Sequence, residues 1–113
     1  MKGQTLKENK DFRRVYYRGK SQASSVLVTY AMKNRRGSNY YGVTTGKKIG
    51  GAVERNRARR IIRVAFNNLE KEIDGSWDFV FVARSKTVFV KEQDVERAMR
   101  YHLVNIGAIN EED

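Results

Sequence analysis

The chain has 113 residues, with 23 lysines and arginines against 13 aspartates and glutamates, and a net charge of +10. This length suits one domain with a modest core, and 40% hydrophobic with 11% aromatic residues argues against disorder. The absence of cysteine excludes disulfides and thiolate metal sites, and no apolar run approaches the roughly 20 residues of a membrane span. We expect a soluble cytoplasmic protein without a secretory signal, because MKGQTLKENKDF at the N-terminus lacks an apolar run.

The first predicted element is a helix from about Asn9 to Arg18. Phe12, Val15 and Tyr16 recur at helical spacing within it. Gly19 follows at once and can close the helix in the left-handed conformation. The sequence therefore predicts a short amphipathic helix that ends at this glycine.

Two β-type segments follow the predicted helix. Residues 25–32, SVLVTYAM, are rich in β-branched and aromatic residues, and residues 40–45, YYGVTT, form a similar run. The polar, glycine-containing turn KNRRGSN between them predicts an antiparallel hairpin. Residues 19–24 could add one further short strand.

A glycine-rich basic loop, GKKIGGAV, leads into a long predicted helix from about Ala52 to Lys71. At about 100° per residue, its apolar side chains gather on one arc and its polar side chains on the opposite arc. The apolar arc contains Ala58, Ile61, Ile62, Ala65, Phe66, Leu69 and Ile73, and the polar arc contains Asn56, Arg59, Arg60, Arg63 and Asn67. One face is therefore predicted to join the core, and the other to meet water or phosphate.

The last third of the chain predicts one strand and one helix. WDFVFVA, residues 77–83, is a near-continuous apolar run of the kind found in central strands. A helix fits Glu92 to Ile106, with acids in its first turn that suit the positive end of the helix dipole. Residues 1–113 thus predict one α/β (α+β) domain in the order α, β, β, α, β, α, with a central sheet of three to four strands and helices on at least one face.

The positive charge is regional. Residues 1–71 hold 18 of the 23 bases against four acids, and residues 72–113 hold five bases against nine acids. No acid occurs between Arg55 and Val64, whereas a helix face that only meets water would normally mix both signs. A polyanionic partner explains this clustering, with nucleic acid favoured over an anionic membrane surface and over an acidic protein.

Two further features bear on how RNA would be bound. Gly46, Gly50 and Gly51 let the backbone approach a phosphate just before a helix N-terminus, although GKKIGG is not a Walker loop. Aromatic residues also alternate with bases near the N-terminus, a pattern that suits a stacked single strand, with core packing as the alternative. The aromatic residues are Phe12, Tyr16 and Tyr30, and the bases are Arg13, Arg14, Arg18 and Lys20.

No self-contained catalytic site emerges from the sequence. The one histidine, His102, lies beside the apolar stripe of the last helix and is better explained by packing than by acid-base chemistry. The acids cluster in the last third of the chain and show no pattern of converging metal ligands. A stand-alone nuclease is therefore disfavoured, and no metal site is assigned to the protein.

The segment KKIGGAVERNRARRIIRVAF, residues 47–66, resembles the signature of the bacterial ribonuclease P protein subunit, with the RNR motif at its centre. The likeness extends over most of the chain. LKENKDFRRVYYRGKS resembles the N-terminal helix and following turn of that family, LVTYA its central strand, and FVFVAR the strand after the basic helix. Gly46 departs from the more usual serine before the lysine pair.

The resemblance implies a subunit that binds the catalytic RNA of ribonuclease P and the 5′ leader of precursor transfer RNA, with Mg²⁺ and catalysis in the RNA and the protein alone inactive. It also implies a left-handed crossover. Independently of the resemblance, we expect no membrane and no obligate protein partner. Matched residues for RNA are Lys47, Lys48, Arg55, Asn56, Arg57, Arg60 and Arg63, to which the helical wheel adds Arg59; those for the leader are Phe12, Tyr16, Val28, Tyr30 and Thr44. A general or ribosome-associated RNA-binding protein is the alternative.

Overall fold

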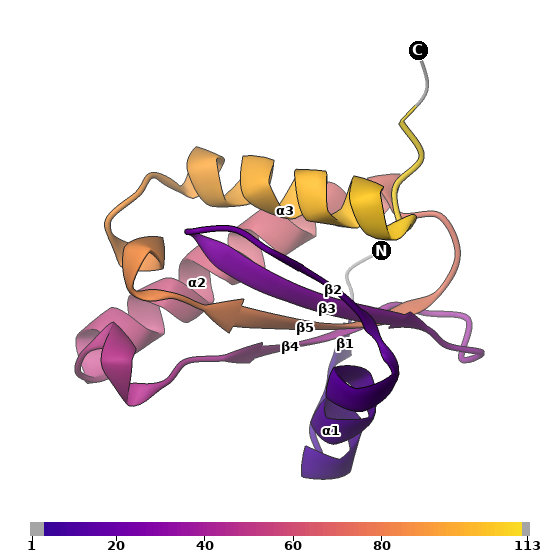
Figure 1. Cartoon of the computed structure of the whole chain (residues 1–113), viewed down its shortest axis with the longest axis horizontal. Helices are drawn as coiled ribbons and strands as arrows, with labels where there is room; N and C mark the ends of the chain where they lie inside the picture. The colour runs from indigo at the N-terminus through magenta and orange to yellow at the C-terminus, as the bar shows by residue number, and fades with distance from the viewer. Residues whose placement is uncertain (1–3, 112–113) are drawn as a thin grey trace.

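The computed structural model describes residues 4–111, which form a five-stranded sheet with three α-helices (Figure 1). The strands are β1 (Gln4–Thr5), β2 (Lys20–Ala23), β3 (Leu27–Lys33), β4 (Tyr40–Thr44) and β5 (Trp77–Ala83). The helices are α1 (Asn9–Arg18), α2 (Ala52–Leu69) and α3 (Glu92–Ile106), with 3-10 turns η1 (Lys47–Ile49), η2 (Glu70–Glu72) and η3 (Ser85–Val88). The predicted α+β class is confirmed, with five strands in the described residues where three to four were expected.

The two edge strands account for the higher strand count. β2 confirms the short strand considered at residues 19–24 and pairs antiparallel with β3. β1 pairs parallel with β4 through Gln4 opposite Tyr40 and Thr5 opposite Tyr41. Two polar residues carry no periodic signal, so sequence reasoning could not find β1.

The predicted hairpin between residues 25–32 and 40–45 is wrong. The strand order is β1-β4-β5-β3-β2, so β5 lies between β3 and β4, antiparallel to β3 and parallel to β4. β5 takes the central place because its apolar run is buried on both faces of the sheet, with only Val82 partly exposed. α2 lies in the crossover that joins the adjacent parallel strands β4 and β5, and the left hand of that crossover stays a prediction.

The helices divide unequally between the two faces of the sheet. α2 and α3 cover one face, whereas α1 lies against the other face at β3 and β5 (Figure 1). Alternate residues of β5 serve the two sides, so Phe79 and Phe81 join the main core while Val80 joins a smaller cluster with Leu6 and Val15. We call the side under α2 and α3 the closed face and the side of α1 the open face.

The closed face is held by aromatic packing on α2. Phe66 is fully buried and stacks on Tyr41, with ring centroids 4.6 Å apart, while Phe79 meets it edge-on at 5.5 Å. The predicted apolar arc is largely confirmed, because all its members are buried except Ile61 and Ile73, which are half-buried. The outer arc of α2 is thereby left to polar side chains.

The end of α1 differs from the prediction. Gly19 has φ −81° and ψ 164°, an extended conformation and not the left-handed one expected. A side chain at this position would collide with the carbonyl oxygens of Val15 and Ala31. Glycine is therefore required for the close approach of α1 to β3, since the chain runs straight from the helix into β2.

His102 is buried on the closed face, in agreement with a packing role. Its Nδ1 lies 2.9 Å from the Thr29 hydroxyl of β3, and the residue is 1% exposed. Burial lowers the pKa of His102 below its ordinary value because the charged form loses hydration. The described helices include none with the length and apolar character of a membrane span.

Candidate nucleic-acid interface

The loop before α2 is shaped by glycines and closed by the one acid near the arginines. Gly50 has φ 132°, a conformation that side chains rarely adopt. The Glu54 carboxylate accepts a hydrogen bond of 2.9 Å from the Gly51 backbone N–H, and so caps the first turn of α2. Glu54 is thereby held at the helix N-terminus, which leaves the arginines beyond it without its charge.

The predicted RNA-binding residues lie in η1 and along α2, and most of them are exposed. Two of the arginines make local contacts: Arg55 donates to the Gly50 carbonyl at 3.2 Å, and Arg59 donates to the Asn56 side chain at 2.7 Å. No acid within the described residues pairs with the remaining bases of the segment. Lys47, Lys48, Asn56, Arg57, Arg60 and Arg63 are exposed, and Arg55 and Arg59 are half-buried.

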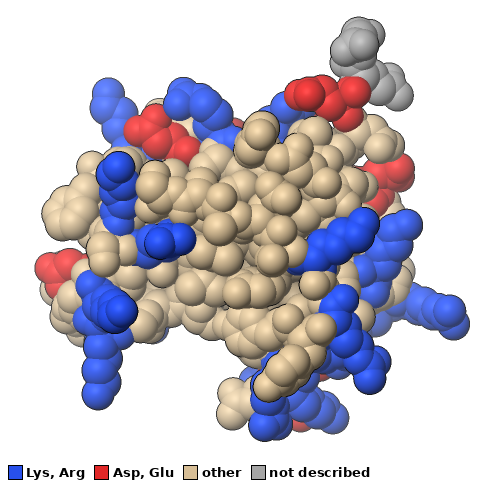
Figure 2. Space-filling view, in the orientation of Figure 1, with Lys and Arg blue, Asp and Glu red and all other residues tan. Residues whose placement is uncertain are grey.

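We call the exposed outer side of α2 with Asn56, Arg57, Arg60 and Arg63 the arginine face. Like-charged guanidinium groups on one face repel each other at a cost that a bound polyanion removes. Arginine also offers planar, bidentate contacts to phosphate. Figure 2 shows one side of the molecule, where lysines and arginines gather at the bottom around α1 and also along the left and right margins, with the few visible acids scattered around the edge.

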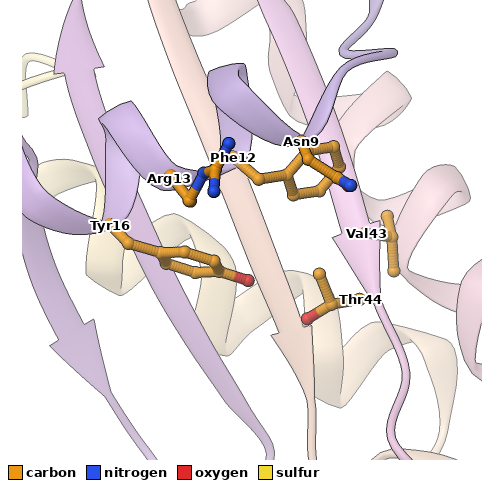
Figure 3. Close-up of a pocket in the computed structure, with 6 residues that line it drawn as sticks. All are labelled: Asn9, Phe12, Arg13, Tyr16, Val43 and Thr44. Atoms are coloured by element: carbon orange, nitrogen blue, oxygen red, sulfur yellow. The ribbon is translucent and has the colours of Figure 1, made fainter.

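An open groove of about 500 Å³ lies between α1 and β4. We call it the aromatic groove, and Figure 3 shows Phe12 and Tyr16 projecting into it from α1 toward β4. Its lining residues are Asn9, Phe12, Arg13, Tyr16, Val43 and Thr44. The groove therefore combines aromatic rings, a base and a hydroxyl, and the first two are features found in sites that bind single-stranded nucleic acid.

The structure brings three of the five predicted leader residues to this groove, and places the other two beside it. Phe12, Tyr16 and Thr44 line the groove directly. Tyr30 instead packs edge-to-face against the ring of Tyr16, with the ring centroids 4.9 Å apart and the ring planes at 84° to each other. Val28 lies two residues before Tyr30 on the same strand, β3, and is half-buried.

Sequence reasoning missed Val82, which completes the floor beside the groove. Val82 of β5 is opposite both Thr44 of β4 and Val28 of β3, so the three residues form one cross-strand row on the open face. The alternation within residues 77–83 could have indicated Val82, but only with the correct strand order. Asn9 could have been found from its helical spacing to Phe12 and Tyr16.

A second hollow, of about 480 Å³, lies where the parallel strands β4 and β5 end. Its lining includes the loop residues Lys47 and Lys48 together with Arg84 and Ser85, which sequence reasoning did not single out. The Ser85 hydroxyl donates to the Lys48 carbonyl at 3.4 Å and so ties the two loops together. The basic loop is therefore continuous with the end of the sheet that borders the aromatic groove.

The bases that alternate with the aromatic residues have different positions. Arg13 lines the aromatic groove, and Arg18 and Lys20 are exposed. Arg14 instead turns under the helix and donates to Asp78 and Asp11, both at 3.0 Å. The hydrogen bond to Asp78, with a smaller effect from Asp11, raises the pKa of Arg14 above its usual value.

The acids do not gather into a metal-binding cluster in the part of the chain that the structure describes. Among residues 4–111 no three histidine, aspartate or glutamate side chains converge. Several have other partners: Asp11 and Asp78 bind arginine, Glu54 caps α2, and Glu72 pairs with Arg100 at 3.2 Å.

The fold and the interface together define a small basic α+β protein with an arginine-rich helix and an aromatic groove, a combination typical of RNA-binding proteins. The family model described as Ribonuclease P matches residues 1–107. The chain belongs to this ribonuclease P protein family. Family members are protein components of a ribonucleoprotein endonuclease that processes transfer RNA, so ribonuclease P RNA is the partner that membership implies.

Named relatives agree over nearly the whole chain. The ribonuclease P protein component of Clostridium botulinum (strain Loch Maree / Type A3) is 40% identical over 97% of this chain and 100% of its own length. That of Clostridioides difficile is 38% identical over 84% of both chains. The solved Staphylococcus aureus protein superposes with a TM-score of 0.83 at 28% identity, over 96% of this chain and 100% of its own.

The Thermotoga maritima ribonuclease P protein supports the fold alone. It superposes with a TM-score of 0.77 over 87% of this chain and 93% of its own, at 24% identity. The strand order and the three helices are thus shared with solved proteins of the family. The roles of individual residues on the arginine face and in the aromatic groove stay predictions.

Proposed function

We propose that this chain anchors the catalytic RNA of ribonuclease P on its arginine face and holds the single-stranded 5′ leader of precursor transfer RNA in its aromatic groove. In this proposal the RNA cuts the substrate, and the protein alone is inactive. The complex acts in the cytoplasm without a membrane or a further obligate protein. The protein contributes charge neutralisation and substrate positioning.

One observation carries the proposal: the aromatic groove ends where the basic loop begins. Thr44 lines the groove, and Gly46 and Lys47 follow it within three residues and line the second hollow. A strand that leaves the groove therefore meets lysines directly, and then the arginine face. This order suits a leader that joins the transfer RNA near the cleavage site in the catalytic RNA.

The chemistry of the groove favours a single strand over a duplex. Bases can stack on Phe12 and Tyr16 only when they are splayed out of a helix. Arg13, exposed beside these rings, can neutralise the phosphate of a stacked nucleotide. The groove would therefore recognise the unpaired leader and contribute little to binding of the folded transfer RNA.

We assign the Mg²⁺ ions of cleavage to the RNA. The buried carboxylate Asp78 and its neighbour Asp11 are engaged by arginine, and Glu54 is engaged by the backbone of the loop. These residues do not fit a cluster of oxygen ligands open to an ion. Magnesium bound by the RNA would supply charge neutralisation during cleavage.

The primary test is reconstitution. The purified protein should stimulate precursor cleavage by a ribonuclease P RNA at low magnesium, and the protein without RNA should cleave nothing. Failure to stimulate any cognate ribonuclease P RNA would refute the proposal. Binding to unrelated structured RNAs with equal affinity would favour a general RNA-binding protein instead.

The arginine face is tested by its salt dependence. Arg60→Ala should weaken RNA binding and reduce the slope of log K against log salt by roughly 0.7–0.9, the value for one lost phosphate contact. Arg97→Ala is the matched control, because Arg97 is exposed on α3 and pairs with Asp94 at 3.1 Å. An unchanged slope for Arg60→Ala would argue against a phosphate contact.

The aromatic groove is tested by a comparison of substrates. Tyr16→Ala should weaken binding of precursor with a leader by about 5- to 150-fold, the range for loss of one stacked base, and should leave mature transfer RNA unaffected. Tyr17→Ala is the control, since Tyr17 is 86% exposed on the same helix and does not line the groove. Equal losses for both substrates would place Tyr16 in a structural role.

A further inference from the structure

Four charged side chains form a closed quartet between α1, β5 and the turn that connects β3 to β4. Arg14 on α1 donates to Asp78 on β5 and to Asp11 on α1, both at 3.0 Å. Arg36 in the turn approaches the same two acids, at 3.7 Å from Asp78 and 3.6 Å from Asp11. Each of the two arginines thus pairs with both aspartates, and the charges of the quartet sum to zero.

Asp78 is the buried centre of the quartet. It is 1% exposed, and it is the only charged residue in β5. Its other carboxylate oxygen accepts a hydrogen bond of 2.8 Å from Asn34, which belongs to the same turn as Arg36. A buried carboxylate without such partners is strongly unfavourable, so these contacts fix what surrounds it.

The quartet acts on the same helix that forms one wall of the aromatic groove. Asp11 and Arg14 alternate along α1 with Phe12, Arg13 and Tyr16, so neighbouring residues point either under the helix or into the groove. Because successive residues turn by about 100°, any rotation of α1 that frees Arg14 also moves the groove residues.

The apolar cluster beneath α1 is small. Among the described residues it has three buried members, Leu6, Val15 and Val80, with five half-buried hydrophobic side chains around them, against the continuous core of the other face. Val80 is two residues from Asp78 and on the same side of β5. Because this cluster is small, the ion pairs of the quartet can make a large contribution to the orientation of α1.

We propose that Arg14 and Asp78 are positioning residues for the leader: through the quartet they hold α1 at the orientation in which Phe12 and Tyr16 face the floor of the aromatic groove. This inference rests on the proposed function of that groove. The Arg14 charge is used inside the protein, whereas the charge of its neighbour Arg13 faces the RNA. Of these two adjacent arginines, Arg14 thus has a structural role and Arg13 a binding role.

The adjacent pair gives a matched experiment. Arg13→Met and Arg14→Met are each assembled with ribonuclease P RNA, and binding of precursor with a leader and of mature transfer RNA is measured over a series of salt concentrations. Arg13→Met should reduce the salt slope for the leader substrate by about 0.7, as expected for one phosphate contact on a single strand. Arg14→Met should lower leader affinity about tenfold, as for partial loss of one stacked base, with the slope unchanged.

A second variant separates positioning from folding. Asp78→Asn preserves the side-chain shape and can still accept the Asn34 hydrogen bond, but it loses the charge that holds Arg14. It should reproduce the leader-specific loss while the affinity for ribonuclease P RNA stays at the wild-type value, since a folding defect would lower both. Arg14→Lys should restore part of the leader affinity, and adding Asp78→Asn to Arg14→Met should cost little more.

The outcomes are distinct. A salt slope reduced as much by Arg14→Met as by Arg13→Met would make Arg14 a direct phosphate contact and overturn the inference. Unchanged leader affinity in both Arg14→Met and Asp78→Asn would overturn it as well. If the wild-type complex itself shows no preference for a leader, the proposed function of the groove fails, and the positioning role fails with it.

Discussion

The closed and open faces of the sheet are built on the same strands but differ in how much apolar surface they bury. On the closed face α2 and α3 bury a continuous core in which Phe66, Phe79 and Phe81 are fully buried. On the open face α1 covers only a small cluster and leaves a groove of about 500 Å³ beside it. Most of the folding free energy therefore comes from one face, and the other can keep apolar rings accessible to a ligand.

The largest expected effect is a loss of stability on the closed face. Phe66→Ala should lower the free energy of unfolding by about 3–5 kcal/mol, because the ring is fully buried between α2 and the sheet. Tyr16→Ala on the open face should cost only about 1 kcal/mol, the value of its edge contact with Tyr30. Urea denaturation measures both, and equal losses would remove the distinction between the faces.

The next effect concerns the fit of α1 over the open face. A methyl group at Gly42 would overlap the Phe12 ring, so Gly42→Ala should push Phe12 into the aromatic groove. We expect leader affinity to fall about tenfold and stability to fall by about 1–3 kcal/mol, as for an overpacked site. Titration with a single-stranded leader oligonucleotide provides the measurement.

The same site offers a compensating control. Phe12→Leu combined with Gly42→Ala removes the overlap by shortening the side chain above the added methyl group. The double variant should regain the stability lost in Gly42→Ala while leader affinity stays low, because the stacking ring is gone. Full recovery of leader affinity would show that Phe12 is not a stacking platform.

A smaller effect is the pH dependence that His102 gives the closed face. Its pKa is lowered in the folded state by burial, so its contribution to stability is complete above the unfolded pKa of about 6.5 and is lost as the pH falls below it. The free energy of unfolding should therefore fall from pH 7.5 to 5.5. His102→Gln should flatten this part of the profile, and an equally steep profile in that variant would assign it to other groups.

The smallest expected effect lies at the border between the groove and the basic loop. A side chain at Gly46 would meet no atom within 4 Å, so Gly46→Ser should fold normally and add a hydroxyl beside Lys47. One added hydrogen bond to phosphate should raise affinity for ribonuclease P RNA about two- to tenfold. Gly46→Ala is the control without a hydroxyl, and an equal gain there would exclude the hydrogen bond.

The helices could be predicted because their signals are local. The apolar spacing of α1 and α3 and the arc of α2 gave their limits to within about two residues, since burial on one side imposes a period of 3.6. The partners of the strands could not be predicted in this way. Nothing in residues 25–45 indicates that residues 77–83 will insert between the two strands, because pairing depends on contacts far apart in the sequence.

The limits of the site prediction have the same origin. The aromatic residues and bases of the N-terminal helix were found by composition and spacing, but Arg14 could not be told from Arg13 because its partner, Asp78, lies 64 residues away. Val82 was missed because its neighbours Thr44 and Val28 are set by strand order. The sequence was sufficient to predict which residue types form the site. Which of these side chains face the core and which face the groove could be seen only in the folded structure.

The alternation along β5 has a consequence for how such a chain can change in evolution. Substitutions on one side of β5 can tune the groove while those on the other side tune the core. A deletion or insertion of one residue at the start of β5, however, would exchange the two sets, turning Asp78 and Val82 toward the core and Phe79 and Phe81 toward the open face. Length changes should therefore be confined to segments outside β5, and β5 should keep the same length in every functional descendant.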